Sequence, residues 1–225
     1  RDESTDNIHS IFVDQWDWEK IIHKEDRNLD YLKETVRTVY KCLRKTEQYM
    51  AIQYDYIDLI LPKEIFFITS QELEDLFPDN TPKEREYYIA KAKGAVCIMQ
   101  IGGRLKSGQP HDGRAPDYDD WTLNCDILFW HKPLDCALEL SSMGIRVDAD
   151  ALRRQLDAAG CPQRAELPFH KLLLDGTLPL TMGGGIGQSR LCMLLLGKAH
   201  VGEVQVSLWD DATVQACRNS GVELL

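Results

Sequence analysis

A stretch of glycines near the end of this chain constrains what the surrounding backbone can pack against. Four of the five residues in 183–187 are glycine, so the backbone there can lie very close to a flat group. Arg190 follows after two more residues and is succeeded at once by the apolar run 191–196, which predicts a helix. A helix N-terminus with a fixed cation favours an anion site. The alternative is a glycine turn before a core helix, with Arg190 in solvent.

Two acidic residues lie on stretches that we expect to be neighbouring antiparallel strands. Asp126 begins an apolar run that ends at residue 130, and Glu139 alternates with leucines in the run 138–148. Carboxylates at the ends of adjacent strands can hold Mg²⁺ together with phosphate oxygens. Alternatively, Asp126 caps a turn and Glu139 faces solvent. The glycine segment with its arginine favours a nucleotide-phosphate site.

The polar residues Gln15 and Asp17 share one face of a predicted strand, because side chains two residues apart point to the same side. An amide and a carboxylate directed into a pocket suit the carboxylate and ammonium groups of an amino acid. The alternative is a solvated polar face. The tryptophans at 16 and 18 indicate that at least one face of this strand is packed.

Residues 111–121 are dense in charge, and their glycine and proline mark a loop. By itself this pattern favours a solvated acidic loop. An arginine such as Arg114 can nevertheless pair with a carboxylate or phosphate through two hydrogen bonds. His111 is a candidate base, since the unperturbed pKa of histidine lies nearest neutrality.

The order of predicted elements favours an α+β fold, with a mixed, mainly antiparallel sheet flanked by helices. The patterns predict helices over residues 28–49, from 70, from 81 to about 93, 148–159 and 167–174. They predict strands over residues 8–16, 65–70, 95–101, 126–130, 138–148 and 202–209. No βαβ unit repeats, which disfavours a parallel sheet. We expect one domain over residues 1–225, with a substantial core.

Composition narrows the class of protein. A net charge of −10 argues against extensive binding to nucleic-acid backbones, which relies on lysine and arginine. No apolar run reaches the 18 or so residues of a membrane span. The seven cysteines lack a metal-binding spacing and several sit in apolar runs. We therefore expect reduced core thiols and a cytoplasmic location, with no membrane or nucleic-acid partner.

Five blocks of the sequence resemble one known family in the right order from end to end. The blocks are residues 10–19, 111–121, 126–130, 139–146 and 183–190. The last two resemble the third motif of class II aminoacyl-tRNA synthetases, and the set more closely resembles the ammonia-dependent asparagine synthetase A family, the aspartate–ammonia ligases. This resemblance implies the catalytic fold of class II synthetases.

The resemblance also implies a reaction. Aspartate would attack the α-phosphate of ATP to give β-aspartyl-AMP and pyrophosphate, and ammonia would then release asparagine and AMP. It implies aspartate, ammonia and ATP as substrates, Mg²⁺ as the metal, and a homodimer. Two other interpretations stay open: an aspartyl- or asparaginyl-tRNA synthetase catalytic domain, and a regulatory paralogue without catalysis. The presence of Asp126, Glu139 and Arg190 argues against the regulatory paralogue.

Residue by residue, the resemblance assigns four sets of positions. Catalysis falls to Arg190, Asp119 and Arg114. Aspartate binding falls to Gln15, Asp17, Asp119, Ser142 and Gly184. Contacts to ATP or AMP fall to Glu3, Ile8, Ser10, Glu139, Ile186 and Arg190, and metal binding to Asp126 and Glu139.

Some assignments keep alternatives. Arg190 would lie along ATP, either stacked near the adenine or facing the phosphates. Either Asp17 or Asp119 would orient an amino group or accept a proton from ammonium.

The chain departs from the family pattern in two places. Family members are longer, and their first motif, a dimer-forming helix and a substrate lysine have no counterpart in these residues. Arg1 is either the arginine of the second motif or its neighbour. Residues 121–124 stand where the family carries a longer mobile loop over the site, so we expect a shortened loop there.

Overall fold

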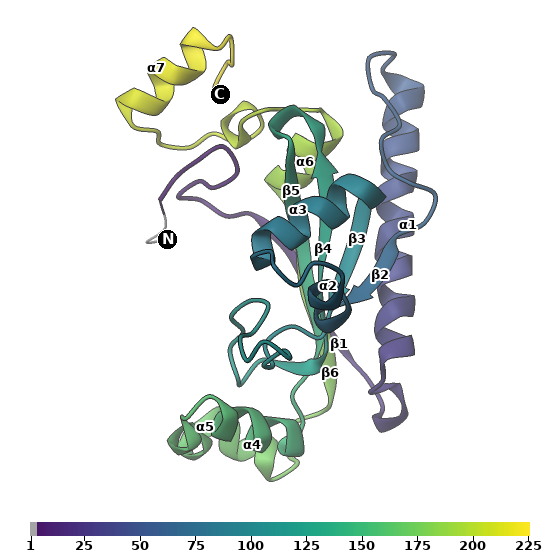
Figure 1. Ribbon diagram of the computed structural model, residues 1–225, viewed down its shortest axis with the longest axis vertical. Helices are drawn as coiled ribbons and strands as arrows, with labels where there is room; N and C mark the ends of the chain where they lie inside the picture. Colours follow the sequence, from purple (N-terminus) through teal and green to yellow (C-terminus); the bar gives the residue numbers. More distant parts are fainter. Residues whose placement is uncertain (1–3) are drawn as a thin grey trace.

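A six-stranded sheet organises the computed structural model, which describes residues 4–225 (Figure 1). The strands lie in the order β1-β6-β5-β4-β3-β2, and every neighbouring pair is antiparallel except β2 and β3. Their bounds are β1 (Gln15–Ile21), β2 (Phe66–Thr69), β3 (Ala95–Met99), β4 (Asp119–His131), β5 (Cys136–Arg146) and β6 (Thr181–Gly187). The sequence prediction of a mixed, mainly antiparallel sheet is confirmed.

One face of the sheet packs on the long helix α1 (Leu29–Gln53) and on α6 (Gln188–Leu195), and Figure 1 shows α1 running alongside the strands. Asn28 caps α1 by accepting a hydrogen bond from the backbone of Tyr31. Apolar side chains at three- and four-residue steps give the helix one buried stripe, made of Leu32, Val36, Tyr40 and Leu43. These residues and Leu191 and Leu194 of α6 belong to the larger core.

The other face is covered only over part of its width. Helices α2 (Ser70–Leu76) and α3 (Pro82–Lys93) pack on β2, β3 and β4, where Leu73 and Ile89 meet Ile98 and Leu128. Both helices begin with a capping box, Thr69 with Glu72 and Thr81 with Glu84, which satisfies backbone donors that would otherwise lack partners. Helix α3 also packs against β5, so the two helices leave β1, β6 and only part of β5 uncovered on this face.

Smaller elements lie at the two ends of the molecule. Figure 1 places α4 (Ala149–Ala158) and α5 (Pro168–Leu174) at one end and α7 (Asp211–Asn219) at the other. Short 3₁₀ turns occur at Lys24–Asp26, Lys132–Leu134, Pro162–Glu166 and Val201–Glu203. Among residues 4–225, no helix has the length and apolar character needed to cross a membrane.

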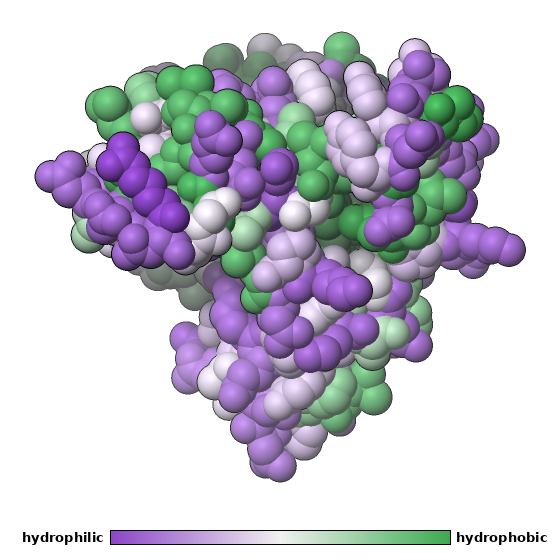
Figure 2. Space-filling model, turned by 90° about the horizontal axis from the view of Figure 1, so that it is seen from above, coloured by the Kyte–Doolittle hydropathy of each residue, from purple (hydrophilic) through white to green (hydrophobic). Residues whose placement is uncertain are grey.

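Hydrophobic side chains are also present on the surface. Figure 2, viewed from above, shows hydrophobic areas between hydrophilic ones. Exposed apolar residues include Ile52 at the end of α1, Leu59 and Ile60 beyond it, and Val206 and Leu208 before α7.

Three local predictions are wrong. The first strand begins at Gln15 rather than at residue 8, because residues 8–14 form an irregular segment beside a cavity. No strand forms at 202–209: Val206 and Leu208 are each 72% exposed, so this alternation has no sheet to join. Residues 121–124 lie inside β4, at a register shift with β5, rather than in a loop.

Asn124 explains how the strand continues through that shift. Its side-chain oxygen accepts from the backbone N–H of Ile101 at 2.8 Å, and its amide donates to the carbonyl of Ile101 at 2.8 Å. These bonds satisfy a buried backbone pair that the shifted ladder leaves without partners.

Glu74 links α2, α3 and the segment after β3. Its carboxylate accepts hydrogen bonds from the hydroxyl and backbone of Ser107, at 2.7 and 3.2 Å, and pairs with Arg85 at 3.2 Å. These partners, with Ser107 first, lower the pKa of Glu74 to about 2. The contact fixes the start of the segment that leads to His111 and Arg114.

We expect Glu74→Gln to lower the free energy of unfolding by about 1–3 kcal/mol at pH 7, because it removes the charge that Ser107 and Arg85 satisfy. The folded-state pKa lies below the ordinary 4.5, so this stabilisation is complete above pH 4.5 and disappears as the pH falls toward 2. Urea unfolding at pH 7 and pH 3 measures both effects, and exposed Glu34→Gln on α1 is the control. An equal loss at both pH values would contradict the assignment.

Candidate active site

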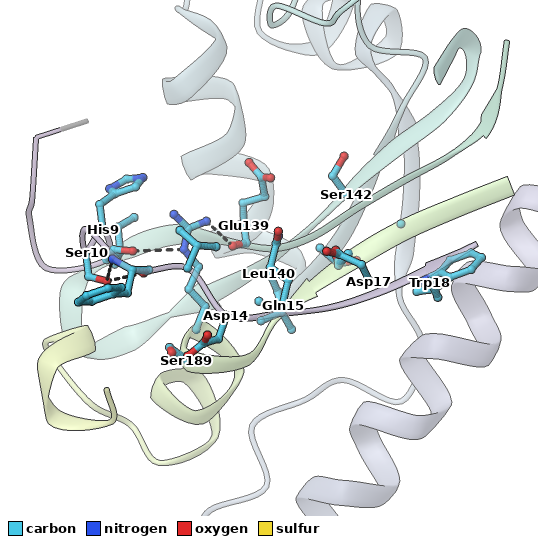
Figure 3. Close-up of a pocket in the computed structure, with 18 of the residues that line it drawn as sticks. His9, Ser10, Asp14, Gln15, Asp17, Trp18, Glu139, Leu140, Ser142 and Ser189 are labelled. Atoms are coloured by element: carbon cyan, nitrogen blue, oxygen red, sulfur yellow. Dashed lines mark hydrogen bonds between the residues drawn. The ribbon is translucent and has the colours of Figure 1, made fainter. Parts of the chain in front are cut away.

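A cavity of about 590 Å³ lies on the same face of the sheet as α2 and α3, over the part that these helices leave uncovered (Figure 3). Strands β1, β5 and β6, the segment 8–14 and the first turn of α6 contribute most of its lining. Nine of the sequence-predicted residues line it: Ile8, Ser10, Gln15, Asp17, Asp119, Glu139, Ser142, Gly184 and Arg190. Residues far apart in the sequence therefore meet in one place.

The glycine segment forms part of strand β6, between β1 and β5, rather than a turn. Glycine leaves space there for the polar side chains of β1: a Cβ on Gly185 would lie 2.6 Å from Asp17 Oδ1 and 3.2 Å from Gln15 Nε2. A Cβ on Gly183 would clash with the side chains of Glu19 and Arg146. Side chains of β1 and β5 therefore lie across β6 at the cavity floor.

Arg146 and Asp119 form the charged centre of this floor. The Arg146 guanidinium pairs with Glu19 at 2.8 Å, pairs with Asp119, and lies 4.0 Å from the centroid of the Tyr118 ring. Burial raises the pKa of Asp119, and Arg146 opposes that shift. A cation shared between two carboxylates is well placed to exchange one of them for a carboxylate of a substrate.

A second charged group joins the middle strands. Asp126 of β4 pairs with Arg114, and its other oxygen, Oδ1, is buried without a hydrogen-bond partner. Burial first, and then the charge of Asp126, raise the pKa of Glu139 on β5 to about 7. Burial also raises the pKa of Asp126. We call Asp126 and Glu139 the acid pair: two desolvated carboxylates that disfavour each other's charge and so favour a cation between them.

Arg190 is held in place by backbone carbonyls. Its Nη1 donates to the carbonyl of Glu139 at 2.8 Å and its Nε donates to the carbonyl of Ile8 at 3.3 Å. Two bonds from one planar group fix its plane beside the cavity. The flat face of the guanidinium is the part suited to stacking on a planar ligand.

Several predicted residues lie elsewhere. Arg114 and Asp126 pair with each other and are not among the residues that line the cavity. The side chain of Ile186 packs against the core, on the opposite side of β6. His111 is buried against Glu86 at 3.1 Å, away from the lining, which disfavours it as a base acting on substrate. Glu3, like Arg1, lies outside the described residues.

The sequence prediction missed Glu19, Arg146 and Tyr118 as lining residues. A signal for Glu19 was present, since it continues the two-residue step of Gln15 and Asp17. Arg146 gave none, because its role depends on β5 placing it across β6 from Glu19.

Comparisons with known proteins indicate one family for this chain. The family model for aspartate–ammonia ligase matches residues 1–221. The chain is 60% identical, over its full 225 residues, to the aspartate–ammonia ligase of Clostridium perfringens strain SM101 and covers 67% of that protein. It is 58% identical to the aspartate–ammonia ligase of Clostridium tetani and covers 66% of it.

The chain belongs to the aspartate–ammonia ligase family. Its activity is the synthesis of asparagine from aspartate and ammonia. The resemblance found in the five sequence blocks is thereby confirmed.

Solved structures show the fold of this ligase. An aspartyl-tRNA synthetase from Entamoeba histolytica matches with a TM-score of 0.62 at 16% identity, covering 94% of this chain and 46% of that one. The asparaginyl-tRNA synthetase of the same organism, in complex with asparaginyl-adenylate, matches with a TM-score of 0.62 at 15% identity, covering 91% and 48%. The expected catalytic fold of class II synthetases is confirmed.

We expect Gly185→Ala to raise the KM for aspartate about tenfold or more, because the added methyl group displaces the carboxylate of Asp17 and the amide of Gln15. Steady-state kinetics with varied aspartate measures the change. Gly103→Ala is the matched control, since no atom lies within 4 Å of a Cβ built there. Unchanged KM in Gly185→Ala would remove Asp17 and Gln15 from the aspartate site.

Proposed function

We propose that this chain makes asparagine in two steps, through β-aspartyl-AMP, with ATP as the activating substrate and AMP and pyrophosphate as products. The observation that carries the proposal is the composition of the cavity. Groups suited to an amino acid, Gln15, Asp17 and Arg146, line it together with Arg190, and the acid pair adjoins them. Residues 1–225 would then belong to one catalytic domain.

Aspartate fits the floor formed over β6. Asp17 and Gln15 offer oxygen acceptors to its ammonium group, and Arg146 offers a bidentate partner to one carboxylate, replacing Glu19 or Asp119. Ser142 and the backbone of Gly184 complete the wall on β5 and β6. Holding the β-carboxylate against ATP would supply much of the rate enhancement.

ATP fits the side of the cavity between segment 8–14 and β5. Both carbonyl contacts of Arg190 leave its flat face for the adenine, which favours stacking over a role facing the phosphates. Ile8 and Ser10 lie beside it. The Ser10 hydroxyl is held by Gln205, so this side of the site is ordered before substrate enters.

Asp126 and Glu139 fit a magnesium ion. The buried Oδ1 of Asp126 accepts no hydrogen bond, and burial together with the charge of Asp126 raises the pKa of Glu139 in spite of the nearby arginines, so a further cation would stabilise both carboxylates. Mg²⁺ would neutralise charge on phosphate oxygens in the first step. Arg114 keeps one oxygen of Asp126 engaged and so orients its carboxylate.

We assign the acceptance of a proton from ammonium to Asp119. Burial raises the pKa of Asp119, which brings its carboxylate closer to the range where it exchanges protons efficiently. It borders the cavity beside Arg146 and so lies near the bound aspartate in this arrangement.

The test is product analysis with the full-length protein, supplied with aspartate, ATP, Mg²⁺ and ammonium, and in parallel with glutamine. AMP, pyrophosphate and asparagine in equal amounts, with little asparagine from glutamine, are expected. Hydroxylamine in place of ammonium should trap aspartyl hydroxamate from the adenylate. ADP and phosphate as products would overturn the mechanism, and aspartate-dependent pyrophosphate exchange without asparagine would indicate a synthetase-like activating domain.

We expect Arg190→Ala and Glu139→Ala each to slow aspartate-dependent pyrophosphate release by about 100- to 1,000-fold, because the first removes the guanidinium proposed to stack on the adenine and the second removes a proposed metal ligand. Arg190→Lys should not restore the rate, because an ammonium cannot stack as a guanidinium does. The exposed Asp157→Asn on α4 is the control. Near wild-type release in either alanine variant would contradict the assignment.

We further propose a homodimer in the cytoplasm. Exposed apolar side chains such as Ile52, Leu59 and Ile60 support a covered surface, and all seven cysteines are unpaired, which suits a reducing compartment. Sedimentation equilibrium of the full-length protein tests the dimer.

A further inference from the structure

A polar cluster that the reaction above does not use lies where α3 meets the sheet. Lys83 and Glu86 come from the first turns of α3, and His111 comes from the segment before β4. Glu86 Oε2 lies 2.8 Å from Lys83 Nζ, and Glu86 Oε1 lies 3.1 Å from His111 Nε2. The side chains of Glu86 and His111 are 9% and 1% exposed, whereas that of Lys83 is 72% exposed.

Contacts connect this cluster to the acid pair. Arg114, three residues after His111, approaches Asp112 at 3.5 Å and bonds to Asp126. Helix α3 itself packs against β4 and β5, the strands that carry Asp126 and Glu139. In Figure 1, α3 lies over these strands. Lys83 therefore extends from the element that borders the acid pair.

Several carboxylates around the acid pair act on the charge of Lys83. Burial disfavours the charge on Lys83, but the carboxylate of Glu86 raises its pKa. Asp112 and Glu139 raise that pKa further. Lys83 therefore belongs to the same group of charges as Glu139, on a helix that packs against β4 and β5.

The phosphates of ATP need cations beyond those already engaged. Four carboxylates gather here, Glu86, Asp112, Asp126 and Glu139, and a bound triphosphate adds further negative charge. Arg190 is bonded to two carbonyls, and Arg114 is paired with Asp126. Lys83 is the cation of this group with an exposed side chain.

We propose that Lys83 binds the β- and γ-phosphates of ATP and the pyrophosphate leaving group, with Glu86 and His111 positioning it. This proposal rests on the adenylate mechanism given above. In that step a carboxylate oxygen of aspartate forms a bond to the α-phosphorus, and the bond from the α-phosphorus to the bridging oxygen breaks. The electron pair leaves on the pyrophosphate oxygen, and the Lys83 ammonium stabilises the charge that develops there.

The contacts of Glu86 explain how Lys83 can leave Glu86 for a phosphate without leaving that buried carboxylate unpaired. A lysine with an exposed head group holds its partner weakly, so exchange of Glu86 for a phosphate is easy. His111 Nε2 stays in contact with Glu86, and the buried carboxylate keeps a hydrogen-bond donor.

The test compares Lys83→Ala, Lys83→Arg and Lys91→Ala in the full-length protein. Lys91 is the matched control, an exposed lysine on the same helix that pairs with Asp135 at 3.0 Å. The readouts are the inhibition constants of pyrophosphate and of AMP, with Mg²⁺ present, and the KM for aspartate. Pyrophosphate and AMP separate the two ends of the nucleotide, because AMP lacks the β- and γ-phosphates.

We expect Lys83→Ala to weaken pyrophosphate inhibition and lower kcat/KM for ATP by about 10- to 100-fold, the loss of one charge-assisted contact. Inhibition by AMP and the KM for aspartate should stay within about twofold of wild type, and Lys83→Arg should recover most of the loss.

Equal weakening of AMP and pyrophosphate would show a merely structural role and overturn the proposal, as would unchanged pyrophosphate inhibition. A wild-type enzyme that forms ADP instead of AMP would defeat the adenylate mechanism itself, whatever Lys83 does.

Discussion

The site depends on three consecutive glycines, Gly183 to Gly185, in an interior strand of the sheet. Glycine weakens a strand, by roughly 0.5–1 kcal/mol relative to alanine, because it has more freedom to lose and nothing to pack. In β6 the cost is balanced by space: Asp17, Glu19 and Arg146 lie over Gly183 and Gly185 and reach positions that any Cβ would occupy. The hydrogen-bond ladder to β1 and β5 keeps this floor rigid. A rigid floor is what positions an amino acid for attack on a phosphate.

The charges on that floor are arranged as exchangeable pairs. Arg146 is shared by Glu19 and Asp119, and Arg114 is paired with Asp126, so each buried charge has a partner before substrate enters. The exception is Glu139, whose carboxylate has no ion-pair partner among the described residues; burial first, and then the charge of Asp126, raise its pKa to about 7. The substrate carboxylate and the metal would therefore bind at different points. The carboxylate would replace Glu19 or Asp119 at Arg146, and the metal would supply positive charge at the acid pair.

Local sequence patterns predicted the helices and the facing of side chains along single strands. The spacing of α1 and the capping of α3 were sufficient, and the two-residue step placed Gln15 and Asp17 on one face. Alternation failed at 202–209, because a strand also needs a sheet edge, which no residue there reveals. The family resemblance predicted Glu139 as a site residue but did not predict Arg146, although both line the cavity. It also predicted Ile186, whose side chain lies on the core side of β6.

The acid pair stands at the border between two halves of one sheet face. Residues of β4 such as Leu128 pack under α3, and two positions earlier Asp126 uses the same face for charge. On β5, Leu138 and Leu140 point into the opposite core, and Glu139 between them therefore points to the face that carries Asp126. The apolar packing that holds α3 on the sheet thus also desolvates these carboxylates, and their burial raises the pKa of both. Because of this, changes in the core below α3 are coupled to the electrostatics of the site, although they touch no substrate.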